Sequence, residues 1–279
     1  MANDPKPPIP SSTVMLLRDD RGVLEVFMVE RHHQIDFASS ALVFPGGKVD
    51  PADRDPALRA RCTGSEGMDD ETFAVRVAAV RETFEECGVL LARKRPKGAR
   101  SEAKPSEVIG PDTRLLSEAE VRPLEARYRA DLLSGAATLG SIAEAHDLDL
   151  ALDAMVPFAH WVTPAFMPKR FDTHFYLVPA PPDQVAAHDG EESVDSLWIA
   201  AAQAVEDAKA KRRMIIFPTL RNLIKLARST SVAEAIERAR REPIVTVLPT
   251  VGKGASGPVI RIPVEAGYDI SEAPLDEAQ

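Results

Sequence analysis

Arg81-Glu82-Thr83-Phe84-Glu85-Glu86-Cys87-Gly88-Val89 is the stretch of this 279-residue sequence that decides its fold. It lies in segment 71–92, which has no proline and no glycine until its last five residues and is predicted to be a helix. Glu82, Glu85 and Glu86 are spaced i, i+3 and i+4, so on a helix they share one stripe within an arc of about 100°. Like charges on one stripe repel each other, and a divalent cation would offset that repulsion. A solvated acidic helix face has the same spacing, so the glutamates alone leave both interpretations open.

A second segment, Phe44-Pro45-Gly46-Gly47-Lys48-Val49-Asp50, precedes the helix and is typical of a short strand that runs into a sharp turn. Together the two segments resemble the Nudix box, which is Gly, five residues, Glu, seven residues, and then Arg-Glu-apolar-x-Glu-Glu-x-Gly-apolar. The second half of the box is matched throughout, except that Thr83 stands in an apolar position. Gly47 takes the first position of the box, and Asp53 replaces its first glutamate.

The box is interrupted in this chain. Between Asp53 and Arg81 stand 27 residues where the family has seven, which is an insertion of 20 residues. An alternative alignment starts at Gly67, at the uninterrupted distance from Arg81, but it places Phe73 at the acidic position. A phenylalanine cannot accept the hydrogen bonds that a carboxylate accepts, so we prefer the alignment on Gly47.

Two later segments narrow the resemblance to one branch. They are His160-Trp161-Val162-Thr163-Pro164 and Lys169-Arg170-Phe171-Asp172-Thr173-His174-Phe175-Tyr176. With the interrupted box, they are similar to the coenzyme A diphosphatase branch of the Nudix hydrolases, which comprises the peroxisomal nudix motif nineteen type and its bacterial relatives. The resemblance covers most of residues 11–241. Other Nudix members carry a fuller coenzyme A signature before the box. Here only Arg31 and Phe44-Pro45-Gly46-Gly47 match it, and Asp36 and Ser40 stand where it has Arg and Gly.

The resemblance implies an α/β fold, namely a Nudix-type α/β/α sandwich with a mixed β-sheet and an added helical insertion. The expected organisation is a disordered tail at 1–10, a Nudix hydrolase domain at 11–242 with insertions at about 54–73 and 94–155, and a C-terminal β-hairpin extension at 243–279. In that extension, segments 244–248 and 259–264 are the two strands expected to pair. Because a packed core has no room for extra residues, we expect the inserted ones to enlarge the rim of the substrate pocket.

The resemblance also implies roles for individual residues. The metal, Mg²⁺ or Mn²⁺, is expected on Glu82, Glu85, Glu86 and the carbonyl of Gly47. The expected catalytic residues are these three glutamates, Arg81, which would orient a box carboxylate, and Glu192, with Glu191 as the fallback. Glu192 would act as base or further ligand, although a surface glutamate in an acidic loop has the same sequence context. The expected substrate-binding residues are Arg31, Gly46, Gly47 and Arg170; an edge-strand surface arginine is the alternative for Arg170.

Basic residues follow the helix in segment 93–111, which is rich in proline and glycine. This composition predicts a loop. The basic residues could meet the 3′-phosphate of coenzyme A or could be solvated in that loop. They are Arg93, Lys94, Arg95, Lys97 and Arg100.

Composition restricts the partners and the compartment. The net charge of −9 argues against a nucleic-acid-coating protein, which would carry a basic face. No apolar run is long enough to span a bilayer, and residues 1–10 do not have the composition of a signal peptide. Cys62 and Cys87 have no short-spaced Cys or His partner, which suits a reducing compartment. We therefore expect a cytoplasmic protein that acts on a small nucleotide-like substrate. The resemblance to Nudix relatives implies a homodimer as one expected assembly.

The expected activity is hydrolysis of the diphosphate bond of coenzyme A or acyl-coenzyme A to 3′,5′-ADP and 4′-phosphopantetheine or its acyl derivative. Two alternatives remain at this stage. The first is another nucleoside diphosphate-linked substrate, such as NADH, an ADP-sugar or a dinucleoside polyphosphate. The second is a Nudix-fold binding module without turnover, which the loss of a metal glutamate would favour, and no such glutamate is lost.

Overall fold

A central β-sheet is built around β1, whose core residues are apolar on both faces. The computed structural model describes residues 6–31, 41–95, 114–181, 184, 186, 193–255 and 257–278. Within these ranges the sheet has eight strands in the order β10-β2-β1-β9-β8-β11, with β3 paired to β2 and β4 to β1. Its strands are β1 (Ile9–Asp20), β2 (Val23–Arg31), β3 (Leu42–Val43), β4 (Gly46–Lys48), β8 (Val156–Val162), β9 (Phe171–Pro179), β10 (Ser193–Ala200) and β11 (Thr246–Val247).

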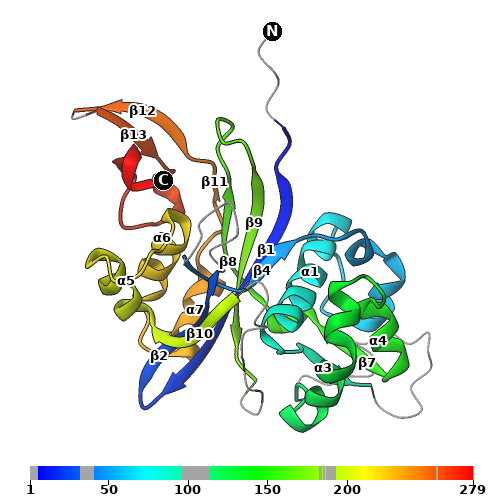
Figure 1. Ribbon diagram of the computed structural model, residues 1–279. Coiled ribbons are helices and arrows are strands. Elements are labelled where there is room, and N and C mark those ends of the chain that lie inside the picture. The colour runs from blue at the N-terminus through cyan, green and yellow to red at the C-terminus, as the bar shows by residue number, and fades with distance from the viewer. Residues whose placement is uncertain are drawn as a thin grey trace.

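Helices cover both faces of this sheet (Figure 1). On one side lie α1 (Asp70–Cys87), α3 (Glu118–Leu133) and α4 (Leu139–Ala145). On the other side lie α5 (Ala201–Lys209), α6 (Phe217–Leu226) and α7 (Val232–Arg241). β1 pairs in parallel with β9 and antiparallel with β2, so the sheet is mixed. This arrangement confirms the predicted α/β class with a mixed sheet and an added helical insertion.

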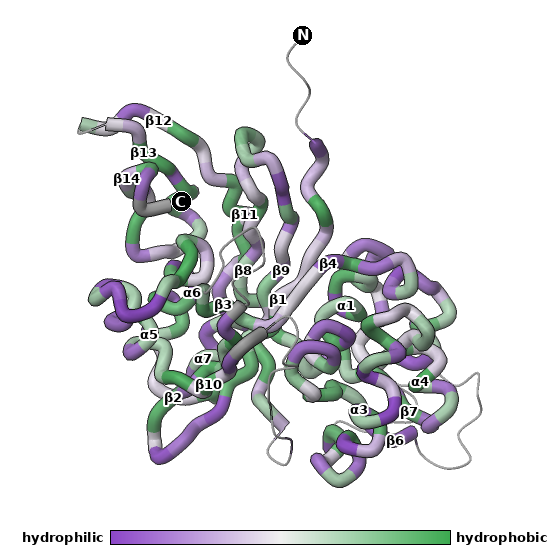
Figure 2. The backbone as a smooth tube through the Cα atoms, viewed as in Figure 1, coloured by the Kyte–Doolittle hydropathy of each residue, from purple (hydrophilic) through white to green (hydrophobic). Residues whose placement is uncertain are grey.

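The alternation of side chains along β1 explains why both faces need a cover. Val14 and Leu16 belong to the hydrophobic core on the α1 side, whereas Met15 and Leu17 belong to the core on the α5–α7 side. All four are at most 1% exposed. Because successive side chains of a strand point to opposite faces, a strand that is apolar at every position is buried on both. Figure 2 shows these hydrophobic stretches in the sheet and in α1. β1 also begins at Ile9, two residues before the expected domain boundary at residue 11.

The helix that carries the box is shorter than the sequence predicts. Asp69 begins α1 by accepting a hydrogen bond from the Thr72 N–H at 2.8 Å. Gly88 ends it in the left-handed conformation, at φ 69°, where a side chain would be strained. The apolar residues 89–91, expected to continue the helix, instead leave it as extended chain buried in the core.

The 20-residue insertion inside the box forms secondary structure that pairs and packs with other parts of the chain. It contains the 3₁₀ helix η2 (Pro56–Arg61), which follows η1 (Pro51–Arg54), and the strand β5 (Cys62–Thr63). β5 joins a second sheet in the order β5-β7-β6, with β6 (Ala92–Lys94) and β7 (Leu148–Ala151), and the 3₁₀ helix η3 (Leu152–Ala154) follows β7. Leu58, Cys62 and Phe73 are buried in the same core as α1. Our premise that a packed core leaves no room for the inserted residues is wrong, because their apolar side chains pack into the core of α1. The enlargement of the pocket rim by the insertion stays a prediction.

Arg93 and Arg95 do not lie in the solvated loop that the sequence predicts. Arg93 is 8% exposed and forms a forked ion pair with Asp153, at 2.7 and 3.0 Å. Arg95 is 6% exposed and donates to Asp149 at 2.8 Å and to the Ala60 carbonyl at 2.9 Å. These two arginines join β6 to β7, η3 and the inserted η2. They are therefore unsuited to a substrate phosphate; Lys97 and Arg100 lie outside the described residues.

The C-terminal extension pairs differently from the expected hairpin. β11 joins the main sheet beside β8, in parallel. The hairpin is formed instead by β12 (Thr250–Gly254) and β13 (Gly257–Arg261), and β14 (Glu272–Pro274) completes a three-stranded sheet. The remaining 3₁₀ helices are η4 (Val264–Ala266) and η5 (Leu275–Ala278). Ile260, Ile262 and Ala273 pack into the core below α5–α7, so apolar burial draws this extension onto the domain. Among the described helices, none is long and apolar enough to cross a membrane.

We expect the buried pair Arg95–Asp149 to stabilise the second sheet and the η2 segment packed on it, since the two side chains are 4% and 0% exposed. Asp149→Ala leaves the Arg95 charge buried without its carboxylate, which typically costs about 3–5 kcal/mol. Glu237→Ala is the matched control, because it removes an exposed i,i+4 pair with Arg241, and such pairs contribute below about 1 kcal/mol. Urea denaturation followed by circular dichroism measures both variants. Equal losses of stability in the two would contradict this assignment.

Candidate active site

Two glycines allow the turn after β3 to lie directly against β1 and α1. β4 pairs with Ser11–Thr13 of β1, and Gly46 has φ 154°. A Cβ on Gly46 would lie 2.2 Å from the Ser12 carbonyl oxygen, and one on Gly47 would lie 2.3 Å from Oε1 of Glu82. A side chain at position 46 would therefore push the turn away from β1, and one at position 47 would displace the Glu82 carboxylate.

The turn is also hydrogen-bonded to the glutamates of α1. The Gly46 N–H donates to Glu86 Oε2 at 2.8 Å. The Gly47 backbone lies against the Glu82 carboxylate, because a Cβ on Gly47 would lie 2.3 Å from Glu82 Oε1. The structure thus brings Gly46 and Gly47 together with Glu82 and Glu86, although 34 residues stand between Gly47 and Glu82 in the chain.

Arg81 connects the two halves of the interrupted box. Its guanidinium donates to both carboxylate oxygens of Asp53, at 3.0 Å to each, and to Glu85 Oε2 at 2.8 Å. It also donates to the Lys48 carbonyl at 2.8 Å and lies 3.0 Å from Glu82 Oε1. Asp53, which is 2% exposed, accepts in addition from the Asp50 N–H. Arg81 therefore holds the carboxylates in place and neutralises part of their charge.

These contacts distinguish between the two alignments of the box. Asp53 occupies the acidic position of the Gly47 alignment and is bound to Arg81. In the alternative alignment, a Cβ on Gly67 would meet nothing within 4 Å, and Phe73 lies in the hydrophobic core. Thr83, in the apolar position, is fully buried and donates to the Ala79 carbonyl at 2.7 Å, so its hydroxyl needs no other partner. The geometry supports the alignment on Gly47.

The electrostatics of the glutamates favour a cation. Burial raises the pKa of Glu82 to about 7, and the neighbouring Glu85 charge also raises it, while Arg81 opposes both effects. Burial makes the ionised form of a carboxylate unfavourable, and a nearby positive charge stabilises that ionised form. Carboxylate and carbonyl oxygens are the ligands that Mg²⁺ and Mn²⁺ prefer, and the glycine turn leaves the Glu82 carboxylate uncovered by any side chain at position 47. The donor set at this site therefore fits a hard divalent cation.

In the described chain the box glutamates are arranged around Arg81 and Gly46 instead of around one point. No three of their carboxylates offer oxygens that all lie within 4.8 Å of one another. Glu82 and Glu85 face the Arg81 guanidinium, and Glu86 faces the Gly46 N–H. A cation at this site would have to draw Glu82 and Glu85 partly away from Arg81.

The box lies in a cleft of about 1530 Å³. Its lining includes the glycines of the turn and the charged residues of the box: Gly46, Gly47, Asp53, Arg81, Glu82, Glu85 and Glu86. The walls continue into apolar side chains from three further parts of the chain. They are Leu132, Leu133 and Leu139 of the helical insertion, Phe166 and Met167 between β8 and β9, and Ile260 and Leu275 of the C-terminal extension.

The other substrate-binding residues expected from the sequence are not placed in this cleft. Arg170 is not part of its lining; its guanidinium donates to the carbonyls of Thr163 at 3.0 Å and Lys6 at 2.8 Å. Arg31 ends β2, and its side chain lies outside the described part of the structure, as do Glu191 and Glu192. Lys48 and Lys169 do line the cleft, and the sequence did not single them out. Lys169 stands next to Arg170 just before β9, and no local pattern distinguishes the two.

The chain resembles known proteins over most of its length. Residues 57–226 match the family model described as the NUDT19 Nudix domain, which is more than half of the chain. Acyl-coenzyme A diphosphatase NUDT19 of Gallus gallus is 27% identical over 246 residues, which cover 75% of this chain and 62% of that protein. The protein of the same name from Xenopus laevis is 22% identical over 242 residues, which cover 75% and 61%. The chain thus spans about six-tenths of the length of these curated relatives.

A solved structure agrees with this relationship. The crystal structure of a NUDIX hydrolase from Alicyclobacillus acidocaldarius is similar with a TM-score of 0.66 and 27% sequence identity. The similarity covers 83% of this chain and 96% of that one. The interrupted box, its contacts with the glycine turn and these matches lead to one conclusion: the chain belongs to the NUDT19 Nudix domain family of the Nudix hydrolases.

Proposed function

We propose that this chain is a metal-dependent diphosphohydrolase that cuts coenzyme A or acyl-coenzyme A into 3′,5′-ADP and 4′-phosphopantetheine or its acyl derivative. One observation carries the proposal: the box carboxylates line the same cleft as a long apolar wall. The carboxylates suit the diphosphate through a cation, and the apolar wall suits a pantetheine arm and an acyl chain. The relatives that are named acyl-coenzyme A diphosphatase support the same substrate class.

The box residues have different roles in this proposal: some bind the cation, and Arg81 positions the carboxylates. Glu82, Glu85 and Glu86 would hold Mg²⁺ or Mn²⁺, with the Gly47 carbonyl as a further ligand. When bound, such a cation lowers the pKa of a water molecule and polarises the bridging diphosphate. Arg81 keeps Glu85 and Asp53 in position and does not need to touch the substrate. Glu192, with Glu191 as the fallback, stays our candidate for the base that accepts the proton of the attacking water.

The cations of the cleft are the candidates for the substrate phosphates. Lys48 follows the glycine turn, and Lys169 lines the cleft between β8 and β9, with its Nζ 5.3 Å from the centre of the Phe171 ring. Arg170, which we expected in this role, donates to two backbone carbonyls instead. We therefore assign the phosphate contacts to Lys48 and Lys169 and regard Arg170 as a residue that fixes the start of β9.

Removal of divalent cations is expected to abolish hydrolysis. EDTA should stop coenzyme A cleavage, and added Mg²⁺ or Mn²⁺ should restore it, because the attacking water and the diphosphate are both activated through the cation. The measurement is 3′,5′-ADP release, followed by liquid chromatography. Full turnover in a sample shown by elemental analysis to be metal-free would disprove the metal-dependent mechanism.

Glu85→Gln is expected to lower kcat by at least about 100-fold, because the amide keeps the shape of the side chain but loses the charge that binds the cation. Glu86→Gln should behave in the same way. Glu237→Gln, on the exposed face of α7, is the control and should leave kcat unchanged. A loss confined to KM would show that Glu85 only binds substrate.

Coenzyme A and its acyl esters are expected to be better substrates than NADH, an ADP-sugar or a dinucleoside polyphosphate. The long apolar wall contacts a pantetheine arm that the other substrates lack. Comparison of kcat/KM across the panel tests this preference, and mass analysis after reaction in ¹⁸O-water shows which phosphorus takes the label. A clearly higher kcat/KM for NADH or an ADP-sugar would overturn the coenzyme A assignment. Binding without turnover of any substrate would instead indicate a Nudix-fold binding module.

A further inference from the structure

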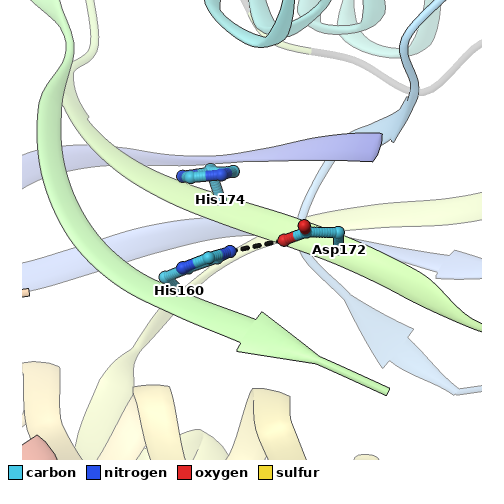
Figure 3. Close-up of side chains that lie close together, drawn as sticks. All are labelled: His160, Asp172 and His174. Carbon is cyan, nitrogen blue, oxygen red and sulfur yellow. Dashed lines mark hydrogen bonds and ion pairs between the residues drawn. The ribbon is translucent and has the colours of Figure 1, made fainter. Parts of the chain in front are cut away.

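Three potential metal ligands meet on β8 and β9, outside the cleft. The antiparallel register places His160 directly opposite His174 and Trp161 opposite Thr173. Asp172 stands two residues before His174 and therefore points to the same face of the sheet. Figure 3 shows the three side chains close together, with His160 pointing toward Asp172 and the His174 ring beside them. One ligand atom from each lies within 4.8 Å of the other two, which no other group of three among the described His, Cys, Asp and Glu residues achieves.

The two histidines of the cluster differ in whether a ring nitrogen is free to bind a metal. The two imidazole rings stack at a centroid distance of 4.0 Å and an interplanar angle of 16°. His160 Nε2 is hydrogen-bonded to Asp172 Oδ1. His174 forms no hydrogen bond through its ring nitrogens in the described part of the chain. Burial lowers the pKa of His174 to about 4, with His160 as the second cause, so its ring is neutral at pH 7, the form that binds metals.

We propose that His160, Asp172 and His174 form a second metal site, for a divalent transition metal of the Zn²⁺ type. Two imidazoles and one carboxylate are a donor set that suits Zn²⁺ better than Mg²⁺, which prefers oxygen ligands alone. Three protein ligands leave a fourth position of a tetrahedral site for water. The site therefore differs from the all-oxygen box in its expected metal.

The surroundings of His160 provide the support that metal-binding histidines usually have. Binding through Nε2 requires the ring proton on Nδ1, where the Thr246 hydroxyl of β11 lies 2.8 Å away and can accept it. Asp172 then exchanges its hydrogen bond to His160 for a bond to the metal. One metal ion would join β8 and β9 directly and β11 through Thr246.

This site is separate from the box but close enough to affect the cleft. None of the three residues lines the cleft, and none belongs to the box. In the sheet, His174 is beside Ser12, and Ser12 is beside Gly47. Two strand spacings of about 4.8 Å therefore separate His174 from Gly47, roughly 10 Å in all. Trp161 and Thr173, the sequence neighbours of the ligands, do line the cleft, so a metal here would stiffen one of its walls.

Zn²⁺ binding to the purified full chain tests the proposal. The background is the double variant Glu85→Gln and Glu86→Gln, which removes the box as a competing site. Isothermal titration should show one Zn²⁺ per chain, and His174→Ala should weaken binding by at least about 10-fold. His146→Ala is the matched control, because His146 contacts Tyr128 near α4 and is not part of the cluster. Equal Zn²⁺ affinity in the two histidine variants, or no Zn²⁺ binding in the background variant, would overturn the proposal.

A second measurement does not depend on how well the histidine variants fold. Long-range ¹H–¹⁵N spectra of the background variant report the ring nitrogens of each histidine during Zn²⁺ addition. We expect the signals of His160 and His174 to shift while that of His146 stays in place. Unchanged His160 and His174 signals at saturating Zn²⁺ would overturn the site. Neither measurement uses catalysis, so an inactive enzyme with a Zn²⁺ site, or an active one without it, would separate this inference from the proposed function.

Discussion

The Arg81 guanidinium lies between Asp53 and Glu85, and the site depends on this contact. Three glutamates on one helix stripe repel each other, so their arrangement needs positive charge nearby. Arg81 supplies a buried charge to Glu85 and Glu82 and, through Asp53, fixes the loop that precedes the insertion. Hydrogen bonds therefore join the two halves of the box across the insertion.

The sheet supplies a rigid base for this arrangement. β1 contacts β4, β9 and β2, and its side chains enter the cores on both faces. One core holds α1 with the box glutamates, while the other holds the C-terminal extension that lines the far wall of the cleft. Residues packed on both sides of β1 therefore line one cleft.

Residues 93–95 show how composition can predict the wrong environment for a charged side chain. Residues 93–95 have the charge of a solvated basic loop, yet Arg93 and Arg95 are buried against Asp153 and Asp149. Those aspartates lie more than 50 residues further along the chain, so no local pattern shows that they neutralise the arginines. A buried cation destabilises the fold unless a carboxylate of this kind pairs with it. Arg170 also has partners that its own segment does not show, since its guanidinium donates to the carbonyls of Thr163 and Lys6.

The sequence by itself determined the α/β class, the box helix, the glycine turn and the choice of Gly47 and Asp53, because each rests on local spacing or on one residue type that the position demands. The sequence also showed three glutamates on one stripe, since helix geometry converts spacing into direction. Only the tertiary structure decided the partners of Arg81, Arg93 and Arg95, the joining of β11 to the main sheet, and the meeting of His160 with His174. Those depend on strand register and on burial between distant segments, and neither quantity is encoded in the periodicity of a single segment.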